Sequence, residues 1–257
     1  MNIALVCIAK DEDNYIDEWI EYHLKLGFSK IIIHQNDWRY KGRYINDKSI
    51  ELIEYDGPDK QMVAYNEFMK NNCHNYDWAG FIDIDEFVVL KKHSCISEFL
   101  ADYNDYHAVG LNWNLFGSNG LEFNGEYSVI KRFTKCGKRF VEEIKCFVNF
   151  NKAKDSLTFT WNPHNVEGSH DKTISVDKSH FINGPHNSDN KGCREIAYIN
   201  HYYIKTPSEF RQKMDRGWPI PMGKYPGYDT DLFNRFNAPE YNEYEDLTAY
   251  NFMYNHV

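Results

Sequence analysis

The chain has 257 residues and a net charge of −9, and it is long enough to bury a full hydrophobic core. The acidic balance argues against a general nucleic-acid surface, which requires a basic footprint. No run of residues approaches the ~18 apolar positions of a membrane span, and the six cysteines include no Cys-x-x-Cys pair of the kind found in zinc ribbons. We therefore expect a cytoplasmic protein without a transmembrane segment.

The first residues alternate apolar strands with an amphipathic helix. Residues 3–9 form a continuous apolar run, which is typical of a strand buried on both faces. Apolar side chains then recur at three- and four-residue spacing over 15–26, which predicts a helix, and Asp13 or Asn14 should cap its start. A second apolar run at 30–34 completes a strand–helix–strand unit, so these two strands should be parallel.

The same order repeats before residue 90. Residues 50–55 predict a third strand, residues 61–70 a helix, and a fourth strand runs through 81–82. Ligands of open α/β sheets bind beyond the carboxyl ends of the strands, so the polar residues at those ends should line one crevice. These residues are Lys10-Asp11-Glu12, Asn36-Asp37 and Asp83-Ile84-Asp85.

Asp83 and Asp85 interrupt an apolar run that extends from residue 78 to residue 90. Successive side chains of a strand point to opposite faces, so the two aspartates would share one face and Ile84 would take the other. Two carboxylates about 6 to 7 Å apart repel each other unless a cation or a proton lies between them. Such oxygen ligands suit Mg²⁺ or Mn²⁺, which leave positions open for substrate phosphates. The alternative is an acidic turn after a buried strand.

Beyond residue 90 the pattern changes to shorter strands and loops, which predicts an extension of the sheet and a partly antiparallel section. Helices are expected at 96–103, 207–216 and 243–255. Strands are expected at 108–113, 127–133, 145–150, 174–181 and 199–204. A loop rich in proline and glycine occupies 217–227.

Several motifs in this chain resemble, in matching order, those of glycosyltransferases related to family 2 and family 92. The resemblance covers most of residues 3 to 217. It is carried by Ile8-Ala9-Lys10-Asp11-Glu12, Glu18 to Phe28, Gln61…Tyr65-Asn66, Ile82 to Phe87, Trp113 to Ser118, and Ile199 to Thr206 with Phe210, Lys213, Arg216 and Gly217.

This resemblance implies an α/β protein of the GT-A fold, with a Rossmann-like, mostly parallel central sheet flanked by helices, a smaller antiparallel section and C-terminal helices. Residues 1–257 would form one catalytic domain: about 1–106 as the nucleotide-sugar half, about 107–217 as the acceptor half, and 218–257 as a C-terminal loop and helix. The implied activity is that of a metal-dependent, inverting hexosyltransferase. It would move a sugar from a nucleotide donor, with UDP favoured, to a glycan or lipid-linked saccharide in polysaccharide or surface glycan synthesis.

The matching positions also assign roles to individual residues. The metal, Mn²⁺ or Mg²⁺, would be bound by Asp83, Asp85 and His201. The acceptor would be bound by Trp113, Phe116, Gly117 and Ser118. His164 lies outside the matching segments, in a polar turn, and is either a further acceptor contact or an ordinary surface histidine. The nucleotide-sugar would be bound by Ala9, Lys10, Asp11, Glu12, Asn36, Asp37, Gln61, Asn66, Asp83 and Ile84. The chain departs from the family pattern with Asp11 in place of Asn and with Asn119 in place of Ser.

An inverting transferase also needs a carboxylate that takes the acceptor proton. Besides the metal ligand Asp85, the sequence offers Glu86 beside the metal motif, and Glu167 and Asp171 in a later loop. None of these three is singled out by its pattern. The basic residues between 131 and 145 could meet phosphates or an anionic glycan, or they could form a solvated hairpin.

Two other classes of function fit parts of the sequence. A phosphohydrolase of the haloacid dehalogenase type also ends a strand with Asp-x-Asp, but its nucleophile usually lies on the first strand, whereas this pair follows the fourth. A non-catalytic module that binds a nucleotide or a glycan would bind the donor without turnover. For the transferase, a cytoplasmic location is compatible with peripheral contact at the inner face of the membrane.

Overall fold

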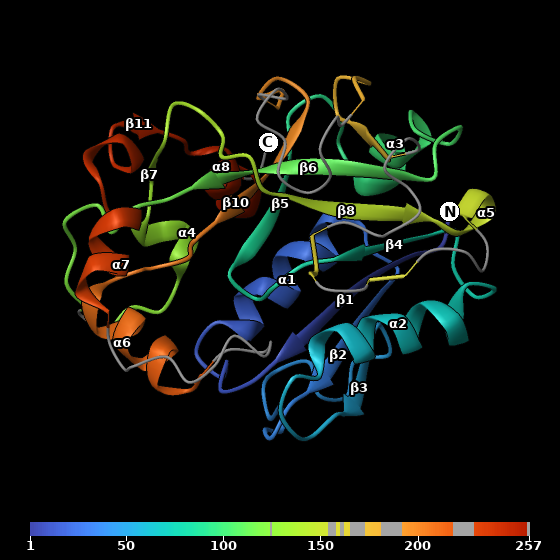
Figure 1. Ribbon diagram of the computed structural model, residues 1–257, viewed down its shortest axis with the longest axis horizontal. Coiled ribbons are helices and arrows are strands. Elements are labelled where there is room, and N and C mark those ends of the chain that lie inside the picture. The colour runs from blue at the N-terminus through green and yellow to red at the C-terminus, as the bar shows by residue number, and fades with distance from the viewer. Residues whose placement is uncertain are drawn as a thin grey trace.

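One sheet of nine strands forms the centre of the part of the chain that this computed structural model describes, residues 1–123, 125–153, 158–159, 162–164, 173–180, 192–217 and 229–255 (Figure 1). Across the sheet its strands are β3 (Ile50–Glu54), β2 (Lys30–Gln35), β1 (Ile3–Ala9), β4 (Trp78–Phe81), β8 (Ile144–Asn149), β6 (Ala108–Leu115), β10 (Ala197–His201) and β5 (Glu86–Leu90). The ninth, β9 (Thr173–Ser175), pairs with β6.

Most neighbouring strands of this sheet are parallel. β1 pairs in parallel with both β2 and β4, and β2 does so with β3. β8 runs antiparallel between β4 and β6, and β5 runs antiparallel to β10. The predicted fold class, a mostly parallel α/β sheet with a smaller antiparallel section, is therefore confirmed.

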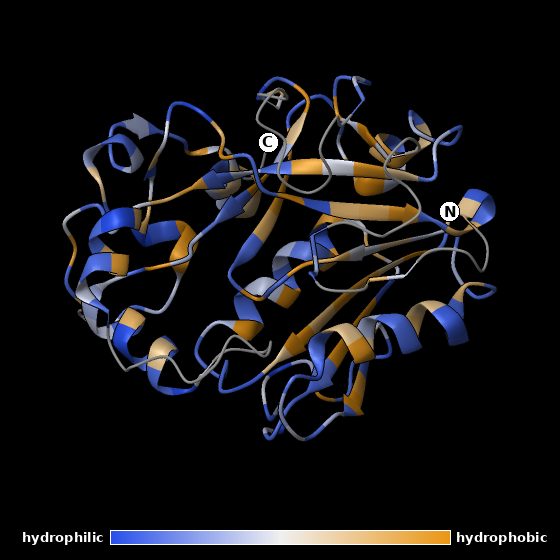
Figure 2. Ribbon diagram, viewed as in Figure 1, coloured by the Kyte–Doolittle hydropathy of each residue, from blue (hydrophilic) through white to orange (hydrophobic). Residues whose placement is uncertain are grey.

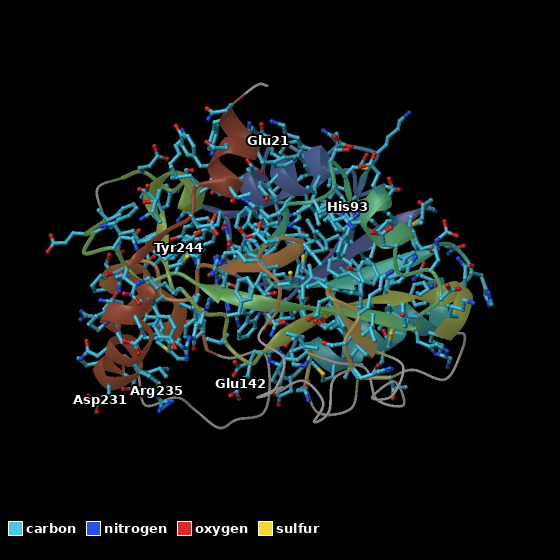
Figure 3. The ribbon with its side chains drawn as sticks, turned by 90° about the horizontal axis from the view of Figure 1, so that it is seen from above. Glu21, His93, Glu142, Asp231, Arg235 and Tyr244 are labelled. Atoms are coloured by element: carbon cyan, nitrogen blue, oxygen red, sulfur yellow. The ribbon has the colours of Figure 1, made fainter. Side chains whose placement is uncertain are left out.

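Helices flank the sheet, and α4, α6 and α7 lie together at one end of the molecule (Figure 1). They are α1 (Ile16–Leu26), α2 (Gln61–Asn72), α3 (Ile96–Ala101), α4 (Val129–Arg132), α5 (Phe150–Ala153), α6 (Pro207–Asp215), α7 (Thr230–Phe236), α8 (Thr248–Tyr254) and the short 3-10 helix η2 (Pro239–Tyr241). β7 (Lys135–Cys136) and β11 (Tyr244–Glu245) form a small separate sheet. In Figure 3 the exposed Asp231 and Arg235 mark the outer edge of α7. Among the described helices, none has the length and apolar character to cross a membrane.

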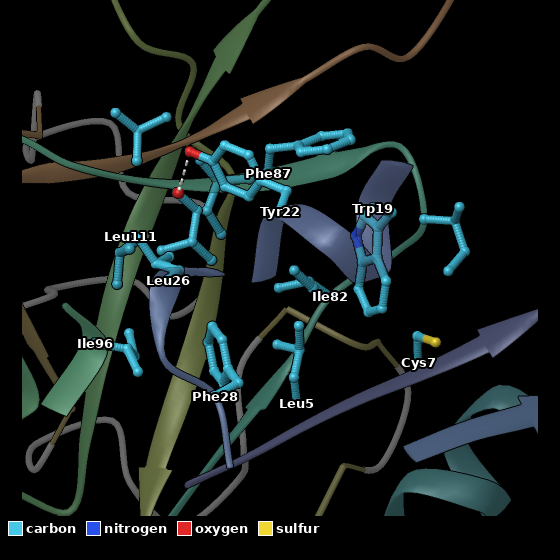
Figure 4. Close-up of a cluster of buried hydrophobic side chains, with 14 of the residues drawn as sticks. Leu5, Cys7, Trp19, Tyr22, Leu26, Phe28, Ile82, Phe87, Ile96 and Leu111 are labelled. Carbon is cyan, nitrogen blue, oxygen red and sulfur yellow. Dashed lines mark hydrogen bonds between the residues drawn. The ribbon is translucent and has the colours of Figure 1, made fainter. Parts of the chain in front are cut away.

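The central strands are apolar because both faces of the sheet are buried. On β1, Leu5 and Cys7 belong to the same hydrophobic cluster as Trp19 of α1 (Figure 4), whereas Val6 packs in the opposite cluster with Tyr65 of α2. The hydropathy colouring shows the same contrast between apolar strands and polar outer helix faces (Figure 2). The continuous apolar pattern of 3–9 thus follows from burial on two sides.

The first helix begins differently from the sequence-based expectation. Neither Asp13 nor Asn14 caps it: Tyr15 is the N-cap residue and makes no side-chain capping bond. The carboxylate of Asp13 instead accepts a hydrogen bond from Trp38 Nε1 at 2.8 Å. At the other end Gly27 adopts φ 99°, in the left-handed region that favours glycine, and its N–H bonds to the carbonyl groups that the helix leaves open.

The predicted strand at 127–133 is wrong, because residues 129–132 form the short helix α4. Glu18 of α1 accepts hydrogen bonds from the Ser128 hydroxyl and, at 2.8 Å, from the Val129 N–H. The Ser128 hydroxyl in turn caps the helix by accepting from the Lys131 N–H. A carboxylate distant in sequence thus decides the local conformation against the strand-like pattern.

The helix predicted at 243–255 begins later, at Thr248. Tyr244 and Glu245 pair with β7 instead, and the carboxylate of Asp246 accepts hydrogen bonds from Tyr198 at 2.7 Å and Arg194 at 3.0 Å. The buried carboxylate of Asp246 therefore fixes the chain before the helix starts.

A buried ion pair joins α6 to α4. Arg132 donates two hydrogen bonds to Glu209, at 2.6 and 2.9 Å, and their side chains are only 6% and 3% exposed. Glu209 also forms a capping box with Thr206, and it accepts a hydrogen bond from Tyr15 at 2.7 Å. Burial alone would raise the pKa of Glu209, but these hydrogen bonds lower it from 4.5 to about 2.

Replacing Glu209 by Gln should therefore make stability less dependent on pH. The folded-state pKa lies below the unfolded value, so the stabilisation is complete above pH 4.5 and is lost as the pH falls towards 2. The wild type should be more stable than Glu209→Gln by about 3 kcal/mol at pH 7, and this difference should shrink by about 2 kcal/mol between pH 6 and pH 3 in urea unfolding.

The matched control is Glu21→Gln, since Glu21 pairs with Arg43 but its side chain is 43% exposed. That variant should lose less than about 1 kcal/mol at either pH. A difference between the wild type and Glu209→Gln that stays constant from pH 6 to pH 3 would contradict the buried ion pair.

Candidate active site

A cavity of about 370 Å³ lies at the carboxyl ends of β1, β2 and β4. Its lining combines residues that follow the first strands with the segment that runs from the end of β10 through α6. The predicted site residues that line it are Ala9, Lys10, Glu12, Asn36, Asp37, Gln61, Asp83, Ile84, Asp85, Trp113, His164 and His201. The three polar clusters of the sequence analysis therefore do converge.

Other predicted site residues lie outside the lining. The side chain of Asn66 bonds to the backbone of Phe159 at 2.6 and 2.7 Å. Asp11 does not line the cavity, but its carbonyl group faces Arg216, with Nη1 at 3.5 Å. Glu86 is fully buried beneath the lining. Two of the proposed catalytic bases, Glu167 and Asp171, lie outside the described residues, as does most of the predicted loop at 217–227.

The predicted acceptor-binding segment 116–118 is also placed away from the cavity. Phe116 is buried against Tyr202, with ring centroids 4.6 Å apart. The Gly117 N–H donates to the Tyr241 carbonyl group at 2.9 Å, and the Ser118 N–H donates to Asn237. The segment holds the C-terminal part of the chain in place, and its acceptor role stays a prediction.

The Asp-x-Asp motif lies in a turn and not on a strand. β4 ends at Phe81, and β5 begins at Glu86, whose N–H donates to the Asp83 carbonyl group at 3.1 Å. The prediction that Asp83 and Asp85 alternate with Ile84 on a strand is therefore wrong. The reason is a change of partner: β4 pairs with β1, whereas β5 pairs with β10, and the chain must turn between them.

Asp83 is held by two donors. Its Oδ1 accepts from Gln61 Nε2 at 2.9 Å, and its Oδ2 lies 2.8 Å from the ammonium group of Lys145. Burial is the largest effect and would raise the pKa of Asp83, but the charge and the hydrogen bond of Lys145, together with His201, outweigh it and the pKa is lowered. The carboxylate is thus ionised, and both of its oxygens are engaged by protein donors.

Lys145 lies in the interior beneath Asp83. Its side chain is 0% exposed, and its ammonium group lies 3.6 Å from Glu86, whose side chain is also 0% exposed. Glu86 Oε2 accepts from the Asp83 N–H at 2.9 Å. Burial raises the pKa of Glu86 well above its usual value, and Lys145 offsets only part of that effect. Glu86 therefore supports the turn and has no contact in the cavity through which it could take an acceptor proton.

Asp85 faces the segment that follows β10. Its Oδ2 lies 2.5 Å from the ammonium group of Lys213, and its Oδ1 lies 3.5 Å from His201 Nε2. Burial would raise the pKa of Asp85, but Lys213 and His201 hold it well below its usual value. The Tyr202 N–H also donates to the Asp85 carbonyl group at 2.9 Å. Both the backbone and the side chain of Asp85 are therefore fixed by this segment.

His201 is enclosed by aromatic rings. The rings of Trp113 and Tyr203 lie 4.2 and 5.4 Å from it, and that of His164 lies 5.0 Å from Trp113. Burial lowers the pKa of His201, although the charge of Asp85 opposes this. The ring is therefore neutral at pH 7, the form in which a histidine binds a metal.

Asp85 and His201 fit a divalent ion. Their facing atoms lie 3.5 Å apart, near the separation of about 3 Å between neighbouring ligands of an octahedral Mg²⁺. In the described part of the chain, no three His, Cys, Asp or Glu side chains are grouped closely enough for a complete metal site. A divalent ion such as Mg²⁺ needs as few as one protein carboxylate, here that of Asp85, because water and substrate phosphates fill the other positions, and His201 would add a nitrogen ligand.

Arg216 links the end of α6 to the turn after β1. It lies 2.6 Å from the carboxylate of Glu12 and donates to the Lys10 carbonyl group at 2.9 Å. Neither Arg216 nor Lys213 was predicted to have a role from the sequence, although both belong to the segment that resembles the family. Their spacing of three residues on a helix, close behind a strand that carries His201, is the signal that could have found them.

The model of glycosyltransferase family 92 matches residues 4–218 of this chain. The chain belongs to glycosyltransferase family 92. The prediction of a glycosyltransferase is thereby confirmed, and the phosphohydrolase alternative is set aside. No curated protein sequence matches the chain.

Among solved structures the chain is similar to HddC from Yersinia pseudotuberculosis, at 13% identity and a TM-score of 0.36, over 84% of this chain and 99% of that one. A complex of the same protein with GMP-PN gives the same values. A197 from STIV is similar at 11% identity and a TM-score of 0.34, over 76% of this chain and 97% of that one.

Removing the buried ammonium group should destabilise the turn that carries both aspartates. Lys145→Met leaves the carboxyl groups of Asp83 and Glu86 without their cation, so the free energy of unfolding should fall by about 3 to 5 kcal/mol in urea titrations. The double variant with Glu86→Gln should recover part of this loss, because one carboxyl group is gone.

The matched control is Lys152→Met, which removes an exposed pair with Asp105 at 3.9 Å. It should cost less than about 1 kcal/mol. Equal losses in the two single variants would show that Lys145 does not hold the turn.

Proposed function

We propose that this protein transfers a sugar from a nucleoside diphosphate donor to a hydroxyl group of a glycan or lipid-linked acceptor, with inversion, as a GT-A type hexosyltransferase in polysaccharide or surface glycan synthesis. The observation that carries the proposal is the cavity in which Asp85 and His201 face each other beside Lys213 and Arg216. It lies where open α/β sheets bind nucleotides. Residues 1–106 would supply most donor contacts, and 107–217 the acceptor contacts.

The donor would lie across the ends of β1, β2 and β4. Asn36 donates hydrogen bonds to the carbonyl groups of Tyr55 and Gly57 at 2.9 and 2.7 Å, which fixes the loop on one side of the cavity. The Arg216 contacts to Lys10 and Glu12 fix the opposite side. Both walls are therefore shaped before a nucleotide arrives, which reduces the cost of binding.

In the reaction the bond between the anomeric carbon and the diphosphate oxygen breaks, and the acceptor oxygen bonds to that carbon from the opposite face and loses its proton to a base. A divalent ion held by Asp85 and His201 would stabilise the charge that develops on the diphosphate. Asp83, fixed by Gln61 and Lys145, would orient the sugar or ribose by accepting its hydroxyl hydrogens. The rings of Trp113 and Tyr203 would exclude water from the cavity.

Replacing Asp85 by Asn should abolish metal-dependent turnover. With Mn²⁺ and a panel of UDP-, GDP- and CDP-sugars, release of nucleoside diphosphate should fall at least about 100-fold, because charge stabilisation by a bound metal is worth several kcal/mol. Asp215→Asn is the control: Asp215 is exposed on α6, outside the cavity lining, and the variant should keep wild-type turnover. Full activity of Asp85→Asn would show that Asp85 does not bind a metal ion required for turnover.

Removal of the imidazole should weaken metal binding directly. His201→Ala should reduce Mn²⁺ affinity about tenfold or more in calorimetry, a change of 1.4 kcal/mol per factor of ten. His74→Ala, at an exposed position, should leave the affinity unchanged.

If donor raises the melting temperature of the wild type but no donor is consumed, the protein is a binding module and not an enzyme.

A further inference from the structure

Lys213 is the cation in direct contact with Asp85, and both residues line the cavity. Its ammonium group donates to Asp85 Oδ2 at 2.5 Å and to the Tyr203 carbonyl group at 3.1 Å, and it lies 4.0 Å from the centre of the Tyr203 ring. The side chain of Lys213 is 19% exposed and that of Asp85 only 8%. The cation is thus the more accessible member of this pair.

A divalent ion and the Lys213 ammonium group compete for the same carboxylate. An ion bound by Asp85 and His201 would lie within a few ångströms of the ammonium nitrogen, and like charges at that separation repel strongly in a buried site. Binding of the ion therefore favours the conformation in which the Lys213 ammonium group no longer contacts Asp85. A partly buried ammonium group that leaves its carboxylate needs another anion.

The other carboxylates of the cavity are largely taken by their own cations. Glu12 pairs with Arg216 at 2.6 Å, Asp83 with Lys145 at 2.8 Å, and Asp37 with Lys10 at 3.5 Å. Of the lining carboxylates only Asp59 has no ion pair among the described residues, so the anion for a displaced Lys213 is either Asp59 or one that a ligand brings.

Lys205 adds to the positive charge beside this pair. Its side chain is 6% exposed and its ammonium group lies 4.5 Å from the ring centre of Tyr15, without a carboxylate partner among the described residues. Burial lowers the pKa of Lys205, and the charges of Asp85 and Glu12 oppose that effect. Once an ion neutralises Asp85, the segment after β10 has an excess of positive charge that a diphosphate would balance.

We propose that Lys213 is a diphosphate-binding residue that leaves Asp85 for a phosphate oxygen of the donor, so that the nucleotide and the divalent ion bind cooperatively. The proposal rests on the proposed function and names the residue that couples its two ligands. Without nucleotide, Lys213 holds Asp85 and disfavours the ion. With nucleotide, the ammonium group moves to the diphosphate and Asp85 becomes available, and by linkage each ligand raises the affinity for the other equally.

Calorimetric titrations of Mn²⁺ and UDP, each alone and with the other saturating, test this coupling in the wild type and in Lys213→Met. In the wild type, UDP should raise Mn²⁺ affinity at least about tenfold. In Lys213→Met, Mn²⁺ alone should bind more tightly than in the wild type, metal-free UDP should bind at least about tenfold more weakly, and the coupling should fall. GDP and CDP are titrated in parallel.

Arg211→Met is the matched control, since Arg211 is exposed on the same helix and does not line the cavity, and it should behave as the wild type. If Lys213→Met does not fold, Lys213→Gln removes the same charge. Coupling in either Lys213 variant equal to that of the wild type, or weaker binding of Mn²⁺ alone, would overturn the role of Lys213 while leaving the transferase intact. A wild type that binds none of the three nucleotides with Mn²⁺ would instead overturn the proposed function.

Discussion

The buried carboxylate of Asp85 is the group on which the geometry of the cavity depends. It lies in the turn where the chain leaves the parallel part of the sheet and joins β5, and its partners Lys213 and His201 both come from the segment at and after β10. One negative charge thus connects two parts of the chain that are more than 100 residues apart in sequence. Removing that charge would leave Lys213 partly buried without its carboxylate.

Ion pairs between residues distant in sequence also hold the walls of the cavity together. Arg216 and Glu12 join the end of α6 to the turn after β1, and Arg132 and Glu209 join the start of α6 to α4. These ion pairs are largely buried, so breaking one costs more than an exposed pair would. The placement of the functional groups therefore depends on the complete fold and not on any single loop.

Much of the fold could be predicted from local patterns. The apolar runs of β1 and β2 and the spacing of α1 follow from burial, and they gave the correct parallel unit. The wrong predictions have a common cause: each of these segments has a partner distant in sequence. Glu18 turns the strand-like segment 127–133 into α4, and the change of pairing between β4 and β5 places Asp83 and Asp85 in a turn.

The candidate site was predictable to a similar extent. The aspartates and His201 could be selected because their chemistry and motif suit a metal. Lys145 was expected either to meet an anionic ligand or to lie on a solvated hairpin, yet it is fully buried beneath Asp83. No local pattern marks a lysine as buried, because its burial depends on the two carboxyl groups that surround it in space.

The most direct measurement is a crystal structure with Mn²⁺ and the nucleoside diphosphate that binds best, in which anomalous scattering locates the metal. We expect the ion within bonding distance of Asp85 and His201, and the Lys213 ammonium group on a phosphate oxygen. A nucleotide bound without an ion at this place, with Lys213 still on Asp85, would contradict the central claim.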